Sequence, residues 1–160
     1  MWSNGTCTTE PVRIDTMWTL QAIPSYRAVT SYDRVVESTR RQTLGHLLVC
    51  VGCCCGRPDK GKPEVPVDWL KAEWKRRTLL KHVQLSISGC LGPCDLVNVI
   101  AVAGPAGIDY YGRLTTRADF EAVVEWATAC AREGVLAPLP ETIAARRIDR
   151  FRAVAVTACA

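Results

Sequence analysis

The chain's first sustained apolar run is LGHLLVC at residues 44–50, and it leads directly into VGCCCG at residues 51–56. An apolar run of this length that stops at a glycine-bearing loop is typical of a buried β-strand. A second strand is predicted at residues 82–88, where apolar and polar residues alternate strictly before GCLGPC at residues 89–94. Both predicted strands therefore end in a cysteine-containing loop.

One helix is predicted between these two strands. Prolines and glycines hold residues 56–63 in a loop, and a helix follows at residues 66–80. After the second cysteine loop, residues 96–103 and 108–112 are predicted to form a hairpin around a Gly-Pro-Ala-Gly turn. A closing helix is predicted from residue 115 or 116 to about residue 132.

The predicted element order is β-α-β-β-β-α, which indicates an α/β domain at residues 43–132. A helix between the first two strands makes those strands parallel, so both cysteine loops should lie at one edge of the sheet. Residues 1–42 show no sustained periodicity and are expected to form an irregular N-terminal extension. Residues 133–160 are expected to form a C-terminal tail, with a loosely attached short helix at residues 143–152.

Composition narrows the classes of function. The chain has 160 residues, 48% of them hydrophobic, and a net charge of +4, which is too mild for a nucleic-acid binder. We also expect no membrane partner, because no apolar run approaches the roughly 18 residues of a membrane span. The first residues lack the basic start and apolar core of a secretory signal, so a cytoplasmic location is expected. In a reducing compartment, nine cysteines favour metal ligation or redox chemistry over disulfides.

Six of the nine cysteines lie in the two short loops, with the spacing C-x4-C-x34-C-x3-C. Two thiolates from each loop suit the two irons of a [2Fe-2S] cluster, and the glycines in these loops permit the tight turns that such ligation needs. The candidate ligands with this spacing are Cys50, Cys55, Cys90 and Cys94. The triple cysteine leaves Cys53 or Cys54 open as a replacement for Cys55.

The succession of strand, C-x4-C loop, helix, strand, C-x3-C loop, hairpin and helix resembles the thioredoxin-like [2Fe-2S] ferredoxins. The same type of spacing occurs in the small iron–sulfur subunit of NADH dehydrogenases. The segments VCVGCCCG at residues 49–56 and SGCLGPC at residues 88–94 are similar to small bacterial (2Fe-2S) ferredoxin-domain proteins associated with cobalamin synthesis and cobalt chelation. The resemblance implies a thioredoxin-like ferredoxin core with a [2Fe-2S] cluster. It also implies an electron carrier or redox sensor without a catalytic site, and a redox partner in corrinoid or cobalt metabolism.

Three other interpretations use the same cysteines. Structural zinc also takes four thiolates, although zinc knuckles usually have two-residue gaps. A thioredoxin-type dithiol would use Cys50 and Cys53, but a helix normally follows such a pair directly, and here residues 56–63 intervene. A metallochaperone for copper, zinc or cobalt would use the extra thiols Cys53 and Cys54.

Two further features bear on partners and packing. Cys130 lies among alanines of the closing helix and is interpreted as a buried thiol. A basic run on the first helix could dock an acidic redox partner or form a solvated face; it consists of Lys71, Lys75, Arg76, Arg77 and Lys81. A homodimer through this helix or through an exposed sheet edge is a further hypothesis.

Overall fold

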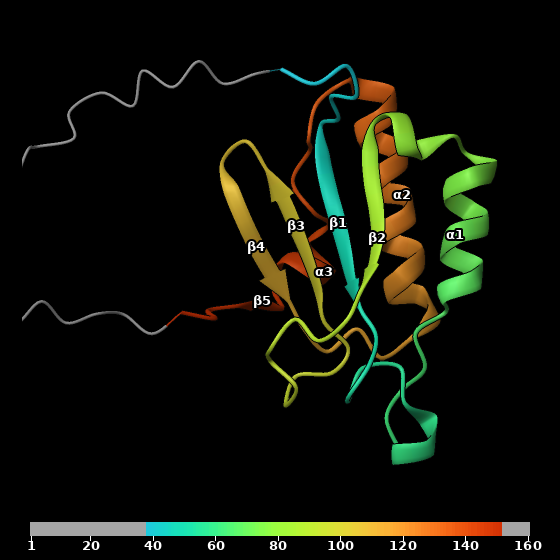
Figure 1. Ribbon diagram of the computed structural model, residues 1–160, viewed down its shortest axis with the longest axis vertical. Helices are drawn as coiled ribbons and strands as arrows, with labels where there is room; N and C mark the ends of the chain where they lie inside the picture. Colours follow the sequence, from blue (N-terminus) through green and yellow to red (C-terminus); the bar gives the residue numbers. More distant parts are fainter. Residues whose placement is uncertain (1–37, 152–160) are drawn as a thin grey trace, which may run out of the picture. The chain divides into compact units, whose positions relative to one another are not determined.

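The structure, a computed structural model, describes residues 38–151 as a mixed α/β fold built on one five-stranded sheet (Figure 1). The larger elements are β1 (Gly45–Cys50), α1 (Val67–Arg76), β2 (Val83–Ser88), β3 (Ile100–Gly104), β4 (Gly107–Tyr111), α2 (Arg117–Glu133), α3 (Glu141–Ala144) and β5 (Arg147–Ile148). Two short 3-10 helices, Pro58–Lys60 and Leu79–Lys81, flank α1. Most of the predicted N-terminal extension, residues 1–37, lies outside the described residues, as do Cys7 and Cys159.

The strands are arranged in the order β2-β1-β3-β4-β5. β1 and β2 are parallel, with Gly45 opposite Val83 and Cys50 opposite Ser88, and the remaining neighbours are antiparallel. The predicted parallel crossover through α1 is therefore confirmed. α1 and α2 contact each other, and both contact β2 (Figure 1).

The core lies between the sheet and these helices. Its side chains are apolar residues that recur on one face of each strand and helix, because an amphipathic element must bury its apolar face against another element. The largest fully buried members are Trp74, Phe120, Leu47, Leu70, Leu79, Ile100, Leu114 and Ile143. The buried Trp74 also donates its indole N–H to the Val83 carbonyl at 2.8 Å, which fixes α1 to β2. Within residues 38–151, no helix is both long and apolar enough to cross a bilayer.

Two predicted boundaries are wrong. The helix predicted at residues 66–80 ends at Arg76, because Thr78 adopts a left-handed conformation with φ of 57°. This turn redirects the chain so that Leu79 becomes buried before β2 begins. The strand predicted at residues 96–103 begins at Ile100, because the preceding Asn98 is buried and bonds to loop backbone instead of to a neighbouring strand.

The C-terminal segment is also more closely attached than expected. Residues 143–152 do not form a loose helix: α3 ends at Ala144, and β5 pairs with β4. Ile143 is completely buried, and the Arg146 guanidinium bonds to the buried Asp119 carboxylate at 2.9 Å. Burial of this apolar side chain and the ion pair to α2 together attach the segment to the domain.

Candidate metal centre

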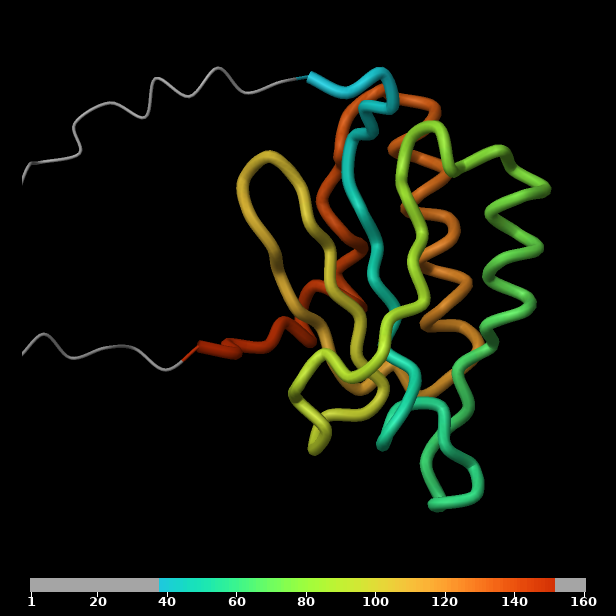
Figure 2. The backbone as a smooth tube through the Cα atoms, viewed as in Figure 1, coloured from blue at the N-terminus to red at the C-terminus, as the bar shows by residue number. Residues whose placement is uncertain are grey.

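The two cysteine loops leave the same end of the sheet, as the parallel pairing requires (Figure 2). The first loop follows Cys50 at the end of β1, and the second follows Ser88 at the end of β2. The Val51 N–H donates to the Ser88 carbonyl at 3.0 Å, and the Leu91 N–H donates to the Cys50 Sγ at 3.5 Å. The prediction that the loops meet is therefore confirmed.

A group of three thiols joins the loops. The Sγ atoms of Cys53, Cys54 and Cys94 all lie within 4.8 Å of one another. The Cys94 Sγ is 3.3 Å from the Cys53 Sγ and 3.3 Å from the Cys90 Sγ. Thiolates around a tetrahedral ion with bonds of about 2.3 Å would be about 3.8 Å apart, so sulfurs that lie within 4.8 Å of one another are close enough to share one ion. The loops thus hold a cysteine cluster that can bind a metal.

The other two loop thiols form a buried pair. Cys50 is 3% exposed and Cys55 is 1% exposed, and both pack against Val99. Burial, together with a hydrogen bond with the Cys50 thiol, raises the pKa of Cys55 to about 12, although the Val99 N–H acts in the opposite direction. Without a metal the Cys55 thiol is therefore protonated at neutral pH.

The structure arranges the four predicted ligands as two pairs. Cys50 and Cys55 contact each other in the interior, and Cys90 and Cys94 contact each other nearer the surface. Of these four, Cys94 alone belongs to the three-thiol group, which also contains both of the alternative ligands, Cys53 and Cys54. Hydrogen bonds with the Cys90 and Cys53 thiols raise the pKa of Cys94.

The buried side chain of Asn98, a residue that falls within the strand predicted at residues 96–103 but precedes β3, supports the first loop. Asn98 is completely buried, and its Oδ1 accepts from the N–H of Gly56, the residue after Cys55, at 2.9 Å. Its Nδ2 donates to the carbonyls of Leu114 at 3.1 Å and Pro63 at 3.2 Å, with a longer contact to a neighbouring carbonyl. The available sequence signal was a single amide inside the apolar stretch LVNVI at residues 96–100.

Two cationic side chains, which sequence reasoning also missed, bind the backbone of the first loop. Arg57 donates to the Gly52 carbonyl at 3.2 Å, and the Lys60 ammonium donates to the Cys53 carbonyl at 2.8 Å. These positive charges lie beside thiols that become anionic when they bind a metal. Arg57 also pairs with the Asp59 carboxylate at 2.6 Å, so the Lys60 ammonium is the charge of the two that favours an anionic thiolate site.

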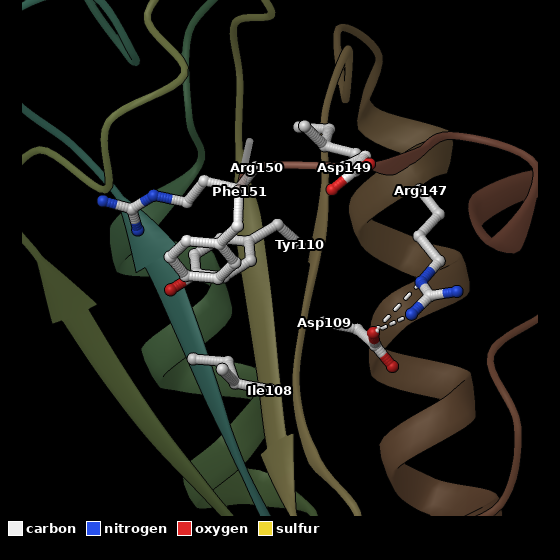
Figure 3. A pocket seen from close by; sticks show the side chains of 8 residues that line it. Ile108, Asp109, Tyr110, Arg147, Asp149, Arg150 and Phe151 are labelled. Atoms are coloured by element: carbon white, nitrogen blue, oxygen red, sulfur yellow. Dashed lines mark hydrogen bonds and ion pairs between the residues drawn. The ribbon is translucent and has the colours of Figure 1, made fainter. Parts of the chain in front are cut away.

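A separate pocket of about 460 Å³ lies over β4 and β5 and contains no cysteine (Figure 3). Its floor includes an ion pair between Arg147 and Asp109 at 2.6 Å, and the Arg150 guanidinium lies 4.9 Å from the centre of the Tyr110 ring. A methyl group added at Gly92 would come within 2.9 Å of the Arg150 Nη2, so this side chain also lies against the second cysteine loop. The C-terminal segment thereby contacts the second cysteine loop at Gly92.

Cys130 is separate from these loops. It is completely buried on α2, as predicted, and its Sγ accepts from the Ala137 N–H at 3.3 Å. Burial raises its pKa, so it is a neutral thiol that packs in the core.

No protein-family model matches the chain, and no curated protein sequence shows significant similarity to it. The class of the site therefore follows from the residues and their geometry alone. It is a cluster of cysteines that could hold a metal, at the loop end of a parallel strand pair in an α/β domain.

Proposed function

We propose that the protein binds a [2Fe-2S] cluster through Cys50, Cys55, Cys90 and Cys94 and acts as a small electron carrier or redox sensor. The observation that carries this proposal is the division of these thiols into two contacting pairs on adjoining loops. A [2Fe-2S] cluster has two irons, each of which takes two protein thiolates. The parallel β1–β2 pair around α1 and the β3–β4 hairpin support a thioredoxin-like ferredoxin core.

The surroundings of the two pairs fit electron transfer. The inner pair accepts a backbone N–H, from Leu91 to the Cys50 Sγ, and such an N–H···S bond favours the reduced, more negative state. The outer pair includes Cys90, which is exposed and offers a route for electron exchange with a partner. An electron carrier or redox sensor of this kind needs no catalytic site of its own. The sequence resemblance alone supports a cytoplasmic redox partner in corrinoid or cobalt metabolism.

A second candidate function is a metal-binding module or metallochaperone for copper, zinc or cobalt. It is favoured by the three-thiol group of Cys53, Cys54 and Cys94, which is partly open to solvent. Three soft thiolates suit Cu(I), and the addition of the adjacent Cys90 would complete a four-thiolate set for zinc. This function would not use the buried Cys50 and Cys55.

The two functions are separated by purification of the full chain without oxygen, followed by iron, sulfide and zinc analysis and by EPR of the dithionite-reduced protein. The cluster predicts equal iron and sulfide, visible absorption and an EPR signal from the reduced state. A colourless protein with stoichiometric zinc and no iron would refute the cluster.

Single replacements identify the ligands. Cys55→Ser is expected to abolish cluster assembly, whereas Cys53→Ser and Cys54→Ser are expected to retain it. Cys130→Ala is the matched control, because it removes a cysteine outside the loops. If Cys53→Ser abolished binding while Cys55→Ser retained it, the three-thiol group would be the metal site and our assignment would be wrong.

A further inference from the structure

β2 forms one edge of the sheet, and within residues 38–151 it pairs with β1 alone (Figure 1). An edge strand presents a row of N–H and C=O groups that can pair with another extended chain. β2 leads directly into Gly89 and Cys90, so a chain that paired with this edge would run beside the second cysteine loop. The edge is therefore a candidate interaction surface next to the metal centre.

The hydrogen bonds show which residues present their backbone to the open edge. The carbonyls of His82 and Ser88 accept from Leu44 and Val51, on the β1 side. Because backbone groups alternate along a strand, those of Val83, Leu85 and Ile87 face away from β1. The Val83 carbonyl accepts a hydrogen bond from the Trp74 indole. The backbone groups of Leu85 and Ile87, further along the strand, face the open edge.

An apolar groove of about 380 Å³ accompanies this edge. Its walls come from α1, the 3-10 helix before β2, and β2 itself, and it is lined by Lys71, Trp74, Lys75, Leu80, Leu85 and Ile87. Leu80 is 49% exposed and lies beside the partly buried Leu85 and Ile87. The groove contains apolar surface and two lysines but no carboxylate.

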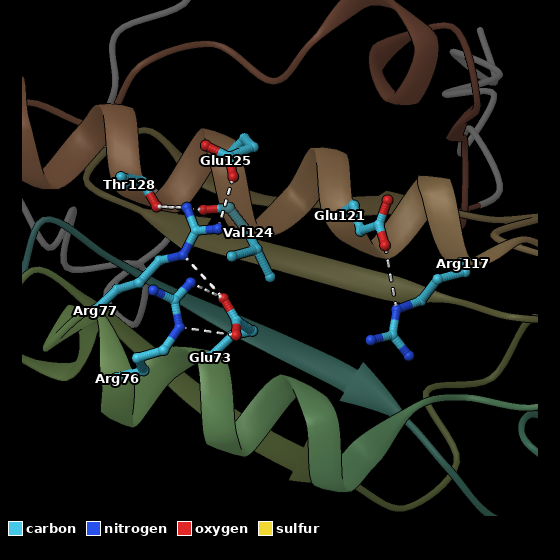
Figure 4. Close-up of polar contacts among 8 residues, drawn as sticks. All are labelled: Glu73, Arg76, Arg77, Arg117, Glu121, Val124, Glu125 and Thr128. Atoms are coloured by element: carbon cyan, nitrogen blue, oxygen red, sulfur yellow. Dashed lines mark hydrogen bonds and ion pairs between the residues drawn. The ribbon is translucent and has the colours of Figure 1, made fainter.

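The charges on α1 are not equivalent. Arg76 and Arg77 both bind the Glu73 carboxylate, and Arg77 also pairs with Glu125 on α2 at 2.7 Å (Figure 4). The hydrogen bond from Arg76, with that from Arg77, lowers the pKa of Glu73 to about 2, so this carboxylate is charged at neutral pH. Lys71 and Lys75 form no ion pair with any residue in the 38–151 range. The predicted basic run is therefore divided: Arg76 and Arg77 are neutralised by carboxylates, Lys71 and Lys75 flank the groove, and Lys81 lies outside both groups.

We propose that the β2 edge and its groove bind an extended segment of a partner protein that carries both apolar and acidic side chains on one face, at every second position. The segment would add to β2 as a strand and turn this face toward α1, so that its apolar side chains enter the groove and the carboxylates on the same face meet Lys71 and Lys75. A second copy of this chain fits poorly, because a two-fold pairing of β2 edges brings these lysines toward their equivalents without any carboxylate in the groove.

The test uses the full-length, metal-free protein in reducing buffer and a short fluorescein-labelled peptide in which every second residue is leucine or glutamate, in turn, and the residues between them are serine. Fluorescence anisotropy is expected to show saturable binding, and amide NMR is expected to show shifts at Leu85 and Ile87. A peptide in which lysine replaces glutamate should bind much more weakly. A peptide with the same side chains but with N-methylated amides on its pairing edge should also lose binding, because it cannot form the strand.

Charge reversal at the groove provides the matched comparison. Lys75→Glu is expected to raise the Kd roughly fivefold, because one attraction is replaced by a repulsion at a solvent-exposed site. Lys62→Glu makes the same charge change at an exposed loop residue outside the groove and should leave the Kd unchanged. Equal effects of the two variants, undiminished binding of the N-methylated peptide, or no binding at all would overturn the proposal.

A dimer seen in sedimentation that Leu80→Asp dissociates would overturn it as well, in favour of a second copy as the occupant. None of these measurements depends on bound metal. The absence of an iron–sulfur cluster would therefore leave the proposed interaction intact. Failure of the peptide to bind would likewise leave the cluster proposal intact.

Discussion

Replacement of Asn98 by alanine is expected to weaken both the fold and the metal centre. The side chain is completely buried and connects three backbone segments: the residue after Cys55, the loop at Pro63, and Leu114 before α2. Alanine would remove every one of these hydrogen bonds. It would also leave the partly buried Gly56 N–H without its acceptor.

The magnitude follows from these contacts. Three bonds of 2.9, 3.1 and 3.2 Å are well formed, and a net contribution of about 1 kcal/mol each gives about 3 kcal/mol. Typical domains unfold with free energies of about 5–15 kcal/mol, so Asn98→Ala should remove a large share of the stability. For a domain of this size we expect the Tm to fall by roughly 10 °C.

The assay is urea unfolding of the metal-free protein in reductant, followed by tryptophan fluorescence, since Trp74 and Trp126 are both buried. Gln84→Ala is the matched control, because it removes an amide that is exposed on β2. We also expect Asn98→Ala to lower the amount of metal retained after desalting, since it releases the residue next to Cys55. A change in unfolding free energy below about 0.5 kcal/mol, as expected for a surface site, would refute the reasoning.

Asn98→Asp gives an independent check with a defined pH dependence. The new side chain keeps an oxygen for the Gly56 N–H but turns a second oxygen toward backbone carbonyls in a completely buried position. Burial would raise the pKa of the introduced carboxyl in the folded state. The variant should therefore be least stable above that pKa and regain stability as the pH falls through it. Greater stability at high pH would contradict this account.

Asp119→Ala should lower the unfolding free energy by about 2 kcal/mol, because the carboxylate accepts from two backbone amides of the α2 cap and binds Arg146. Burial alone would raise the pKa of Asp119, but these bonds hold it below its usual value. The advantage of wild type over Asp119→Asn in urea unfolding should thus be present above about pH 4 and disappear as the pH falls below the folded pKa. Gly92→Ala should cost more than about 1 kcal/mol in thermal unfolding, because its φ is 112°, whereas Gly89→Ala, with open space around it, should cost less. Trp74→Phe should remove about 1 kcal/mol and speed amide hydrogen exchange in β2, because it deletes the indole bond to that strand.

The sequence predicts well those elements whose formation depends on a local pattern of residues. Alternation at residues 82–88 marks β2 to within one residue, and the helix between two strands implies their parallel pairing. The misplaced boundaries depend on distant partners that no local pattern contains. Asn98 delays the start of a predicted strand because it bonds to residues 16 to 42 positions away, and β5 pairs with β4 next to Arg146, which binds Asp119 on α2.

The candidate metal site is also predictable only in part from the sequence. Topology alone predicts that the loops after β1 and β2 meet, since both follow parallel strands. Which thiols come together depends on the path of the first loop, where the Gly52 N–H donates to the Cys55 carbonyl at 3.1 Å. This turn leaves Cys53 and Cys54 between its ends, beside Cys94, while Cys55 returns to the interior. Spacing in the sequence cannot distinguish these three consecutive cysteines. They differ in the direction in which the loop turns each side chain, and the spacing contains no information about that direction.

Cys94 connects the two candidate functions. It contacts Cys90 on one side and Cys53 on the other, so a metal held by the three-thiol group occupies a ligand that the proposed cluster needs. The two occupants therefore compete. Stoichiometric zinc added to the metal-free protein should block cluster reconstitution, and Cys53→Ser should relieve this block by weakening the three-thiol group. Cluster assembly at the wild-type level in the presence of bound zinc would show that the two sites are separate and that Cys94 is not shared.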